Sequence, residues 1–264
     1  MARAGLFSTM AVAVLAGLLG VSPATAEDAA CSAPDSLMRL DRAIAHTAAR
    51  ISEGHSLKIV ALGSSSTVGI GATSPTNSYP SRLEAMLREQ YPDMEIEVIN
   101  RGVGGEDARE MLARLDKSVL AERPDLVLWQ VGTNAIVDDE GVSQEAHLVR
   151  KGLARLNKAG VDVILIDPQY SPTVIRRPHA GAMVRMLKTV AQAANVSVFR
   201  RFAIMSHWRT VEHVPFERFT VRDGLHMNDW GYQCIARLLA NSIVAAASQP
   251  VPVAGGSLVQ QARL

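Results

Sequence analysis

Two separated segments carry side chains that together suit nucleophilic catalysis. Ser64, Ser65 and Ser66 lie in a turn between Gly63 and Thr67, directly after an apolar run, where a hydroxyl can be exposed at a strand end. Far downstream, Asp223 precedes His226 by three residues, a spacing that can place a carboxylate beside an imidazole. A serine, a base and a group that orients the base are the minimum for acyl transfer through a covalent serine intermediate.

Two further segments lie between these residues and are candidates for the donors that stabilise an oxyanion. Residues 100–106 read Asn-Arg-Gly-Val-Gly-Gly-Glu, and residues 132–134 read Gly-Thr-Asn. The glycines at 102, 104 and 105 are also compatible with a phosphate-binding loop. That loop requires Lys-Ser/Thr next, however, and Glu106-Asp107 follows instead.

The elements that must position these residues alternate between strand and helix. Short apolar runs predict buried strands over residues 57–62, 96–99, 126–131, 161–166 and 196–199. The spacing of apolar residues predicts helices over residues 36–52, 79–90, 106–120, 143–158, 179–194 and 229–247. About five such alternations are typical of a parallel sheet that is covered by helices on both faces.

The order of the segments agrees with this architecture. In open parallel sheets, ligands bind beyond the carboxyl ends of the strands. Residues 63–67, 100–106 and 132–134 follow the first, second and third predicted strands, and residues 223–226 follow the fifth. We therefore expect the chemically interesting residues to meet at one edge of the sheet.

From about residue 57 to residue 239, the chain resembles the SGNH hydrolases, a branch of the GDSL esterases and lipases. Four separated blocks carry the resemblance in order: residues 63–65, 100–106, 132–134 and 223–232. The resemblance implies a three-layer α/β/α, flavodoxin-like fold with a parallel sheet of about five strands.

The resemblance also assigns roles to single residues. It implies that Ser65 is the nucleophile, His226 the base and Asp223 the group that orients the base. It implies that the backbone N–H groups of Ser65 and Gly105 and the side-chain amide of Asn134 form the oxyanion hole. The loss of one such donor typically lowers the rate about a hundred- to a thousandfold.

Three positions depart from the family pattern. Ser64 stands where the family usually has Asp before the nucleophile, and Ala135 stands where an Asp often follows Gly-Thr-Asn. Met227 replaces a Pro that is often found after the terminal His. The two family carboxylates mainly support the loops around the oxyanion hole, so their loss concerns the rate and the geometry of the hole.

The ends of the chain predict export. Arg3, the apolar run 4–20 and Ala24-Thr25-Ala26 match a signal peptide over residues 1–26, although an uncleaved anchoring helix is the alternative. Residues 27–248 would then form the catalytic domain, with a disordered tail over residues 249–264. The prediction is a periplasmic or secreted protein with no integral membrane segment after cleavage.

Composition and cysteine content indicate which partners, metals and disulfides to expect. The 27 Lys and Arg residues nearly balance the 26 Asp and Glu residues, so no net field favours nucleic acid. The other histidines show no ligand spacing with acids or cysteines, and we predict neither a metal nor a cofactor. Cys31 and Cys234 predict a disulfide in an oxidising compartment, and two unrelated thiols are the alternative.

Residues 200–222 lead into Asp223 and combine aromatic and basic side chains. The segment contains five Arg together with His207, Trp208, His213, Phe216 and Phe219. One interpretation is an ordinary solvated loop with aromatic side chains packed beneath it. The other is a lip of the site whose aromatic and Arg side chains contact a sugar or an anionic acyl group.

The sequence therefore predicts a serine esterase that is exported and hydrolyses O-acyl esters, with acetyl on a carbohydrate as the leading substrate. Its partner would be an acylated small molecule or a glycan, and the sequence does not predict an oligomeric state. The same triad would serve an acyltransferase, a thioesterase or a lysophospholipase. A non-catalytic glycan-binding module is a second class, although the joint presence of Ser65, Asp223 and His226 argues against it.

Overall fold

The computed structural model describes Met1 and residues 31–248. Residues 32–248 belong to one compact unit, which contains the fold described below. The predicted signal peptide (apart from Met1) and the predicted disordered tail lie outside the described residues.

Five parallel strands form one sheet, and the fold class predicted from the sequence is confirmed. The strands are β1 (Leu57–Gly63), β2 (Ile96–Gly102), β3 (Leu126–Gln130), β4 (Asp162–Ile166) and β5 (Ser197–Phe199). Their order in the sheet is β2-β1-β3-β4-β5. The chain therefore reverses its direction across the sheet between β1 and β3, and ligands of doubly wound sheets bind at such a switch point.

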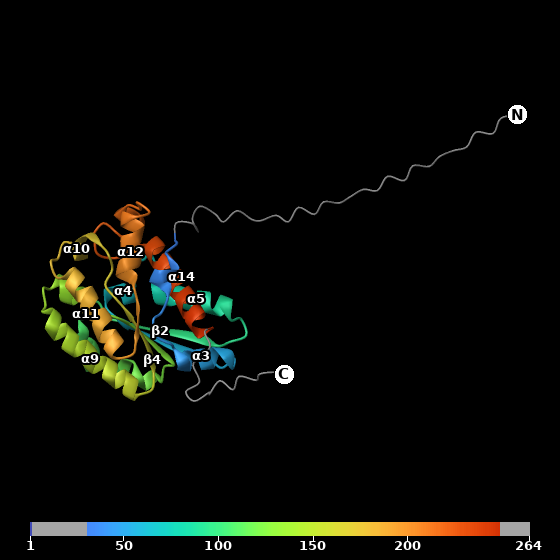
Figure 1. Ribbon diagram of the computed structural model, residues 1–264, viewed down its shortest axis with the longest axis horizontal. Helices are drawn as coiled ribbons and strands as arrows, with labels where there is room; N and C mark the ends of the chain where they lie inside the picture. The colour runs from blue at the N-terminus through green and yellow to red at the C-terminus, as the bar shows by residue number, and fades with distance from the viewer. Residues whose placement is uncertain (2–30, 249–264) are drawn as a thin grey trace, which may run out of the picture. The chain divides into compact units, whose positions relative to one another are not determined.

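Helices cover both faces of the sheet (Figure 1). One face carries α3 (Ala45–Ser52), α5 (Tyr79–Gln90) and α14 (Asp229–Ala247), and the other carries α6 (Ala108–Ala113), α9 (Val142–Lys158) and α11 (Ala180–Ala193). Alternate side chains of the central strands, such as Val127 and Trp129 of β3, are buried against the second group. The period of two along each strand thus supplies apolar side chains to both faces.

The remaining elements are short and lie in the connections between strands and long helices. They are α2 (Asp35–Met38), α4 (Ser65–Val68), α7 (Leu115–Ser118), α8 (Thr133–Val137), α10 (Pro172–Ile175), α12 (Arg201–Thr210), α13 (Phe216–Phe219) and the 3-10 turns η1 (Pro75–Asn77) and η2 (Leu120–Glu122).

Two predicted helices are wrong as single elements. Residues 36–52 form α2 and α3 with an extended connection, because Arg42 binds Ser197 of β5 through its backbone: its N–H donates to Ser197 Oγ (2.8 Å), which donates to its carbonyl (3.1 Å). Residues 106–120 are likewise divided between α6, α7 and the start of η2. In the first case a tertiary contact outweighs the local helical pattern.

Residues 200–222 are not an open loop but contain α12 and α13. Trp208 and Phe219 are fully buried and contact each other edge to face, with ring centroids 5.8 Å apart. The aromatic side chains of this segment therefore divide between a buried group and a partly exposed group that includes Phe216.

The predicted disulfide is confirmed. Cys31 and Cys234 are the two cysteines of the chain, and both are disulfide-bonded. Cys234 is fully buried in α14, the helix that follows the 223–226 segment. Among the described helices, none has the length and apolar character to cross a membrane.

Candidate active site

Three side chains from opposite ends of the sequence form a hydrogen-bonded chain at the carboxyl edge of the sheet. His226 Nε2 lies 2.8 Å from Ser65 Oγ, and His226 Nδ1 lies 2.6 Å from Asp223 Oδ2. The other carboxylate oxygen of Asp223 accepts the backbone N–H groups of Leu225 (2.7 Å) and His226 (2.9 Å). The loop thus orients its own carboxylate toward the imidazole.

These hydrogen bonds determine the charge state of Asp223. Partial burial raises the pKa of the Asp223 carboxyl, but the hydrogen bonds from the His226 ring and from the two backbone N–H groups outweigh it. The net result is a pKa below the ordinary value, so Asp223 is ionised at neutral pH. An ionised carboxylate stabilises a positive imidazolium beside it.

The turn that carries Ser65 is held by a buried glutamine that sequence reasoning missed. Gln130, the last residue of β3, accepts hydrogen bonds through Oε1 from Ser64 N–H (2.9 Å), Ser64 Oγ (3.0 Å) and Thr67 Oγ1 (3.2 Å). Space for this carbonyl exists because residue 63 is glycine: a Cβ there would lie 2.8 Å from Gln130 Oε1 and 2.1 Å from Thr67 Oγ1. Ser64 therefore contributes to the turn through Gln130.

The three predicted oxyanion donors, Ser65, Gly105 and Asn134, follow the carboxyl ends of β1, β2 and β3. Within residues 31–248, the N–H groups of Ser65 and Gly105 donate to no protein acceptor. Gly105 has a φ of 85°, in the left-handed region that favours glycine. Asn134 directs Nδ2 to the carbonyl of Glu106 (2.8 Å), which occupies one of its two amide hydrogens and leaves the other for a ligand.

An ion pair supports this group of donors. Arg114 Nε lies 2.9 Å and 2.7 Å from the two carboxylate oxygens of Glu106, and both side chains are largely buried. Arg114 also donates through Nη2 to the carbonyl of Arg101 (2.8 Å). Because the carbonyl of Glu106 accepts the Asn134 amide and Glu106 follows Gly105, this ion pair holds the segment that contains two of the predicted oxyanion donors, where Ala135 supplies no carboxylate.

A second buried glutamine, also missed from the sequence, fixes the His226 loop. Gln169 follows β4 at the same edge of the sheet and donates through Nε2 to the carbonyl of Leu225 (3.2 Å). Its Oε1 accepts hydrogen bonds from Thr133 Oγ1 (3.0 Å) and from the fully buried Arg201 (2.9 Å). Its position after a predicted strand is the one sequence signal that could have identified it.

A group of acidic residues lies at the start of α6 and on the neighbouring helix α9. Asp107 caps α6 by accepting the N–H groups of Arg109 (2.6 Å) and Glu110 (3.2 Å). Glu145 of α9 is fully buried. Burial, reinforced by the negative charges of Asp107 and Glu140, raises the pKa of Glu145 to about 8, so it is protonated at neutral pH.

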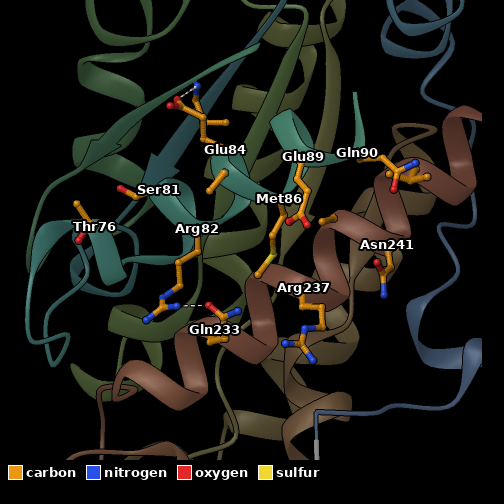
Figure 2. A pocket seen from close by; sticks show the side chains of 14 residues that line it. Thr76, Ser81, Arg82, Glu84, Met86, Glu89, Gln90, Gln233, Arg237 and Asn241 are labelled. Carbon is orange, nitrogen blue, oxygen red and sulfur yellow. Dashed lines mark hydrogen bonds between the residues drawn. The ribbon is translucent and has the colours of Figure 1, made fainter. Parts of the chain in front are cut away.

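A large cavity lies away from these residues. It has a volume of about 1030 Å³ and is bordered by α5 and α14 (Figure 2). Arg82 binds Gln233 across it, and neither Ser65 nor His226 contributes to its lining. It holds no nucleophile beside a base, so we do not assign the chemistry to it.

Comparisons with known proteins agree with this fold. A family model described as the Non-GDSL lipase-like family matches residues 30–249. An acetylxylan esterase from Geobacillus stearothermophilus is 33% identical over 58 residues, which is 22% of this chain and 26% of that protein. The chain thus spans about a quarter of the length of this curated relative.

Solved structures extend the likeness to most of the chain. A two-domain esterase active on acetylated mannans has a TM-score of 0.66 at 18% identity, and the match covers 81% of this chain and 56% of that one. A lipase/acylhydrolase from Enterococcus faecalis has a TM-score of 0.61 at 28% identity, over 72% of this chain and 96% of that one. A variant of an acetyl xylan esterase from Geobacillus stearothermophilus has a TM-score of 0.62 at 20% identity, over 72% and 95%.

A five-stranded parallel sheet with these sequence blocks at its carboxyl edge defines the SGNH class of hydrolases, in agreement with the resemblance seen in the sequence. Within that class, the chain belongs to the Non-GDSL lipase-like family.

Proposed function

We propose that this protein is an exported serine esterase that removes acetyl groups from an acetylated carbohydrate. The observation that carries the proposal is the continuous contact from Asp223 through His226 to Ser65 Oγ. An isolated serine is a weak nucleophile, and a base within hydrogen-bond reach is what activates it.

In the proposed mechanism, Ser65 Oγ attacks the ester carbonyl while its proton passes to His226 Nε2. The carbonyl oxygen becomes an oxyanion, which the N–H groups of Ser65 and Gly105 and the amide of Asn134 stabilise. The tetrahedral intermediate collapses, the bond to the sugar oxygen breaks, and His226 returns the proton to that oxygen. A water molecule then attacks the acyl-enzyme by the same route and releases acetate.

The substrate class follows from the relatives. The curated relative is an acetylxylan esterase, and one solved structure is an esterase active on acetylated mannans. Both act on acetyl esters of polysaccharides, which supports the same class here. The predicted signal peptide over residues 1–26 would deliver the enzyme to the periplasm or the exterior, where such polysaccharides are found.

The proposal is tested by the hydrolysis of p-nitrophenyl acetate and by acetate release from acetylated xylan and mannan. We expect the wild-type protein to act on all three and Ser65→Ala to abolish the activity while the circular dichroism spectrum stays unchanged. A fluorophosphonate should label Ser65. Labelling of Ser64 or Ser66 would contradict the assignment, and Ser143→Ala at an exposed position of α9 serves as the matched control.

A further inference from the structure

A shallow cavity of about 450 Å³ has a composition that ester cleavage does not explain. It is lined by Tyr170, Ile175, Arg209, Thr210, His213 and Phe216. None of these residues belongs to the triad or to the oxyanion donors. We refer to it below as the aromatic cavity.

On one side, the aromatic cavity adjoins the 223–226 loop through the segment after β4. Tyr170 directly follows Gln169, whose side chain donates to the carbonyl of Leu225. Ile175 ends α10, and Thr173 of the same helix donates its N–H to the carbonyl of Gly224 (2.8 Å). This wall of the cavity is therefore attached directly to the catalytic loop.

The opposite wall is attached to the same loop from the other direction. Phe216 begins α13, and Thr220, directly after that helix, pairs with Met227 in an isolated β-bridge. The next residue, Val221, donates its N–H to the carbonyl of His226 (2.9 Å). Both walls are thus connected by hydrogen bonds to the loop of Asp223 and His226.

Aromatic rings give the cavity a fixed apolar surface. The rings of Tyr170 and Phe216 are stacked with centroids 6.0 Å apart and an angle of 20° between their planes. Phe202 supports Tyr170 edge to face at 5.1 Å, and the Arg209 guanidinium lies 5.3 Å from the Phe216 ring centroid. Binding sites for small molecules typically combine such apolar surfaces with a few polar groups.

The polar groups of the cavity are available to a ligand. Within the part of the chain that the structure describes, the Tyr170 hydroxyl, the Arg209 guanidinium and the His213 ring form no hydrogen bond or ion pair with protein. His213 also has a φ of 58°, a conformation that costs energy for a residue other than glycine. The chain therefore holds an imidazole at the cavity in a strained backbone position.

We propose that the aromatic cavity is a subsite for a glycosyl unit next to the acetylated unit that reacts with Ser65. The C–H face of a pyranose would lie against Tyr170 and Phe216, and its hydroxyls would accept or donate hydrogen bonds at Arg209 and His213. This inference rests on the proposed function and deepens it: the substrate is an oligomeric or polymeric acetylated glycan, whose adjoining units contribute to binding.

The test compares acetylated manno- and xylo-oligosaccharides of one to four units with p-nitrophenyl acetate. We expect kcat/KM of the wild-type enzyme to rise with oligosaccharide length. Arg209→Gln and His213→Asn should each lower kcat/KM on the longer substrates about tenfold more than on p-nitrophenyl acetate, mainly through KM. Asn suits the left-handed backbone at 213, so this variant removes the imidazole without a new folding cost.

Arg150→Gln, on the exposed surface of α9, is the matched control and should leave kcat/KM unchanged on the oligosaccharides and on p-nitrophenyl acetate. An equal loss on p-nitrophenyl acetate and on the oligosaccharides would show a structural role and overturn the subsite. The subsite would also be overturned if kcat/KM rose with oligosaccharide length in both cavity variants as it does in the wild type.

A binding measurement separates failure of the subsite from failure of the proposed function. Titration calorimetry of Ser65→Ala with unacetylated mannotetraose and xylotetraose should detect binding to at least one, and the affinity should fall about tenfold when Arg209→Gln is added. If p-nitrophenyl acetate is cleaved but no acetylated sugar is, the proposed function fails. If acetylated sugars are cleaved but Arg209→Gln changes neither length dependence nor affinity, the subsite alone fails.

Discussion

At the scale of single residues, Asp223, His226 and Ser65 form a chain of short hydrogen bonds that we expect to act as a unit. His226→Ala removes the proton acceptor of Ser65 and should lower kcat on p-nitrophenyl acetate on the order of ten-thousandfold or more. Asp223→Asn keeps the shape but removes the charge that holds the imidazole, so we expect a smaller but still large loss. Steady-state assays of both single variants and of the double variant measure this. Losses that multiply in the double variant would contradict a triad.

Gln130 accepts three hydrogen bonds from the turn around Ser65, and we expect the geometry of that turn to depend on it. Gln130→Met keeps the length of the side chain but leaves Ser64 and Thr67 without their buried acceptor. We expect kcat on p-nitrophenyl acetate to fall about tenfold or more and the free energy of unfolding to fall by about 1–3 kcal/mol. Urea unfolding and steady-state kinetics measure the two effects, and Gln144→Met on the exposed face of α9 is the control. Full activity in Gln130→Met would show that the turn holds Ser65 without this contact.

At the scale of elements, a buried carboxyl between α6 and α9 makes stability depend on pH. The pKa of Glu145 is raised to about 8 in the folded protein, against about 4.3 for an exposed Glu. The folded state therefore keeps a proton that the unfolded state has lost between these values. Stability from this group is fully present below the unfolded pKa and is lost as pH rises through the folded pKa.

Glu145→Gln should reduce this dependence, because the amide resembles the protonated carboxyl and has no proton to lose. We expect little change in Tm at pH 5 and an increase of several degrees relative to wild type at pH 8. Asp167, whose pKa burial raises to about 7, contributes with the same sign, so some pH dependence remains in the variant. Scanning calorimetry across this range is the measurement, with Glu89→Gln on the exposed side of α5 as the control. A constant difference in Tm at all pH values would contradict the assignment.

The elements also show how far the sequence alone could lead. The long helices over 79–90 and 229–247 were predicted at their observed bounds, because their apolar stripe and end signals agree. The positions of the candidate site segments at the carboxyl edge of the sheet could be predicted, because apolar runs indicate where each strand ends. The contacts of Gln130, Gln169 and Arg114 could not be predicted, because each joins segments that are distant in sequence. The division of residues 36–52 escaped prediction for the same reason: the contact of Arg42 with Ser197 is tertiary.

At the scale of the whole molecule, the disulfide joins Cys31 to the last helix, α14. Cys31 and Cys234 enclose a loop of about 200 residues, and closing so long a loop reduces the entropy of the unfolded chain. The chain-entropy model gives a stabilisation of about 4 kcal/mol or more, which is reduced by any strain in the folded state. Because α14 begins at Asp229, shortly after His226, a loss of this stability should also lower the temperature at which activity is lost.

The double variant Cys31→Ser/Cys234→Ser should therefore unfold at a lower urea concentration than the oxidised wild type and lose esterase activity at a lower temperature. Reductant should lower the same urea concentration and the same temperature for the wild type, whereas it should leave both unchanged for the double variant. This comparison distinguishes the effect of the disulfide bond from the effect of substituting the two side chains. Titration of thiols in the unfolded, unreduced protein should find none. Two titratable thiols, or equal stability of oxidised and reduced wild type, would mean that burial of Cys234 in α14 accounts for its contribution without the bond.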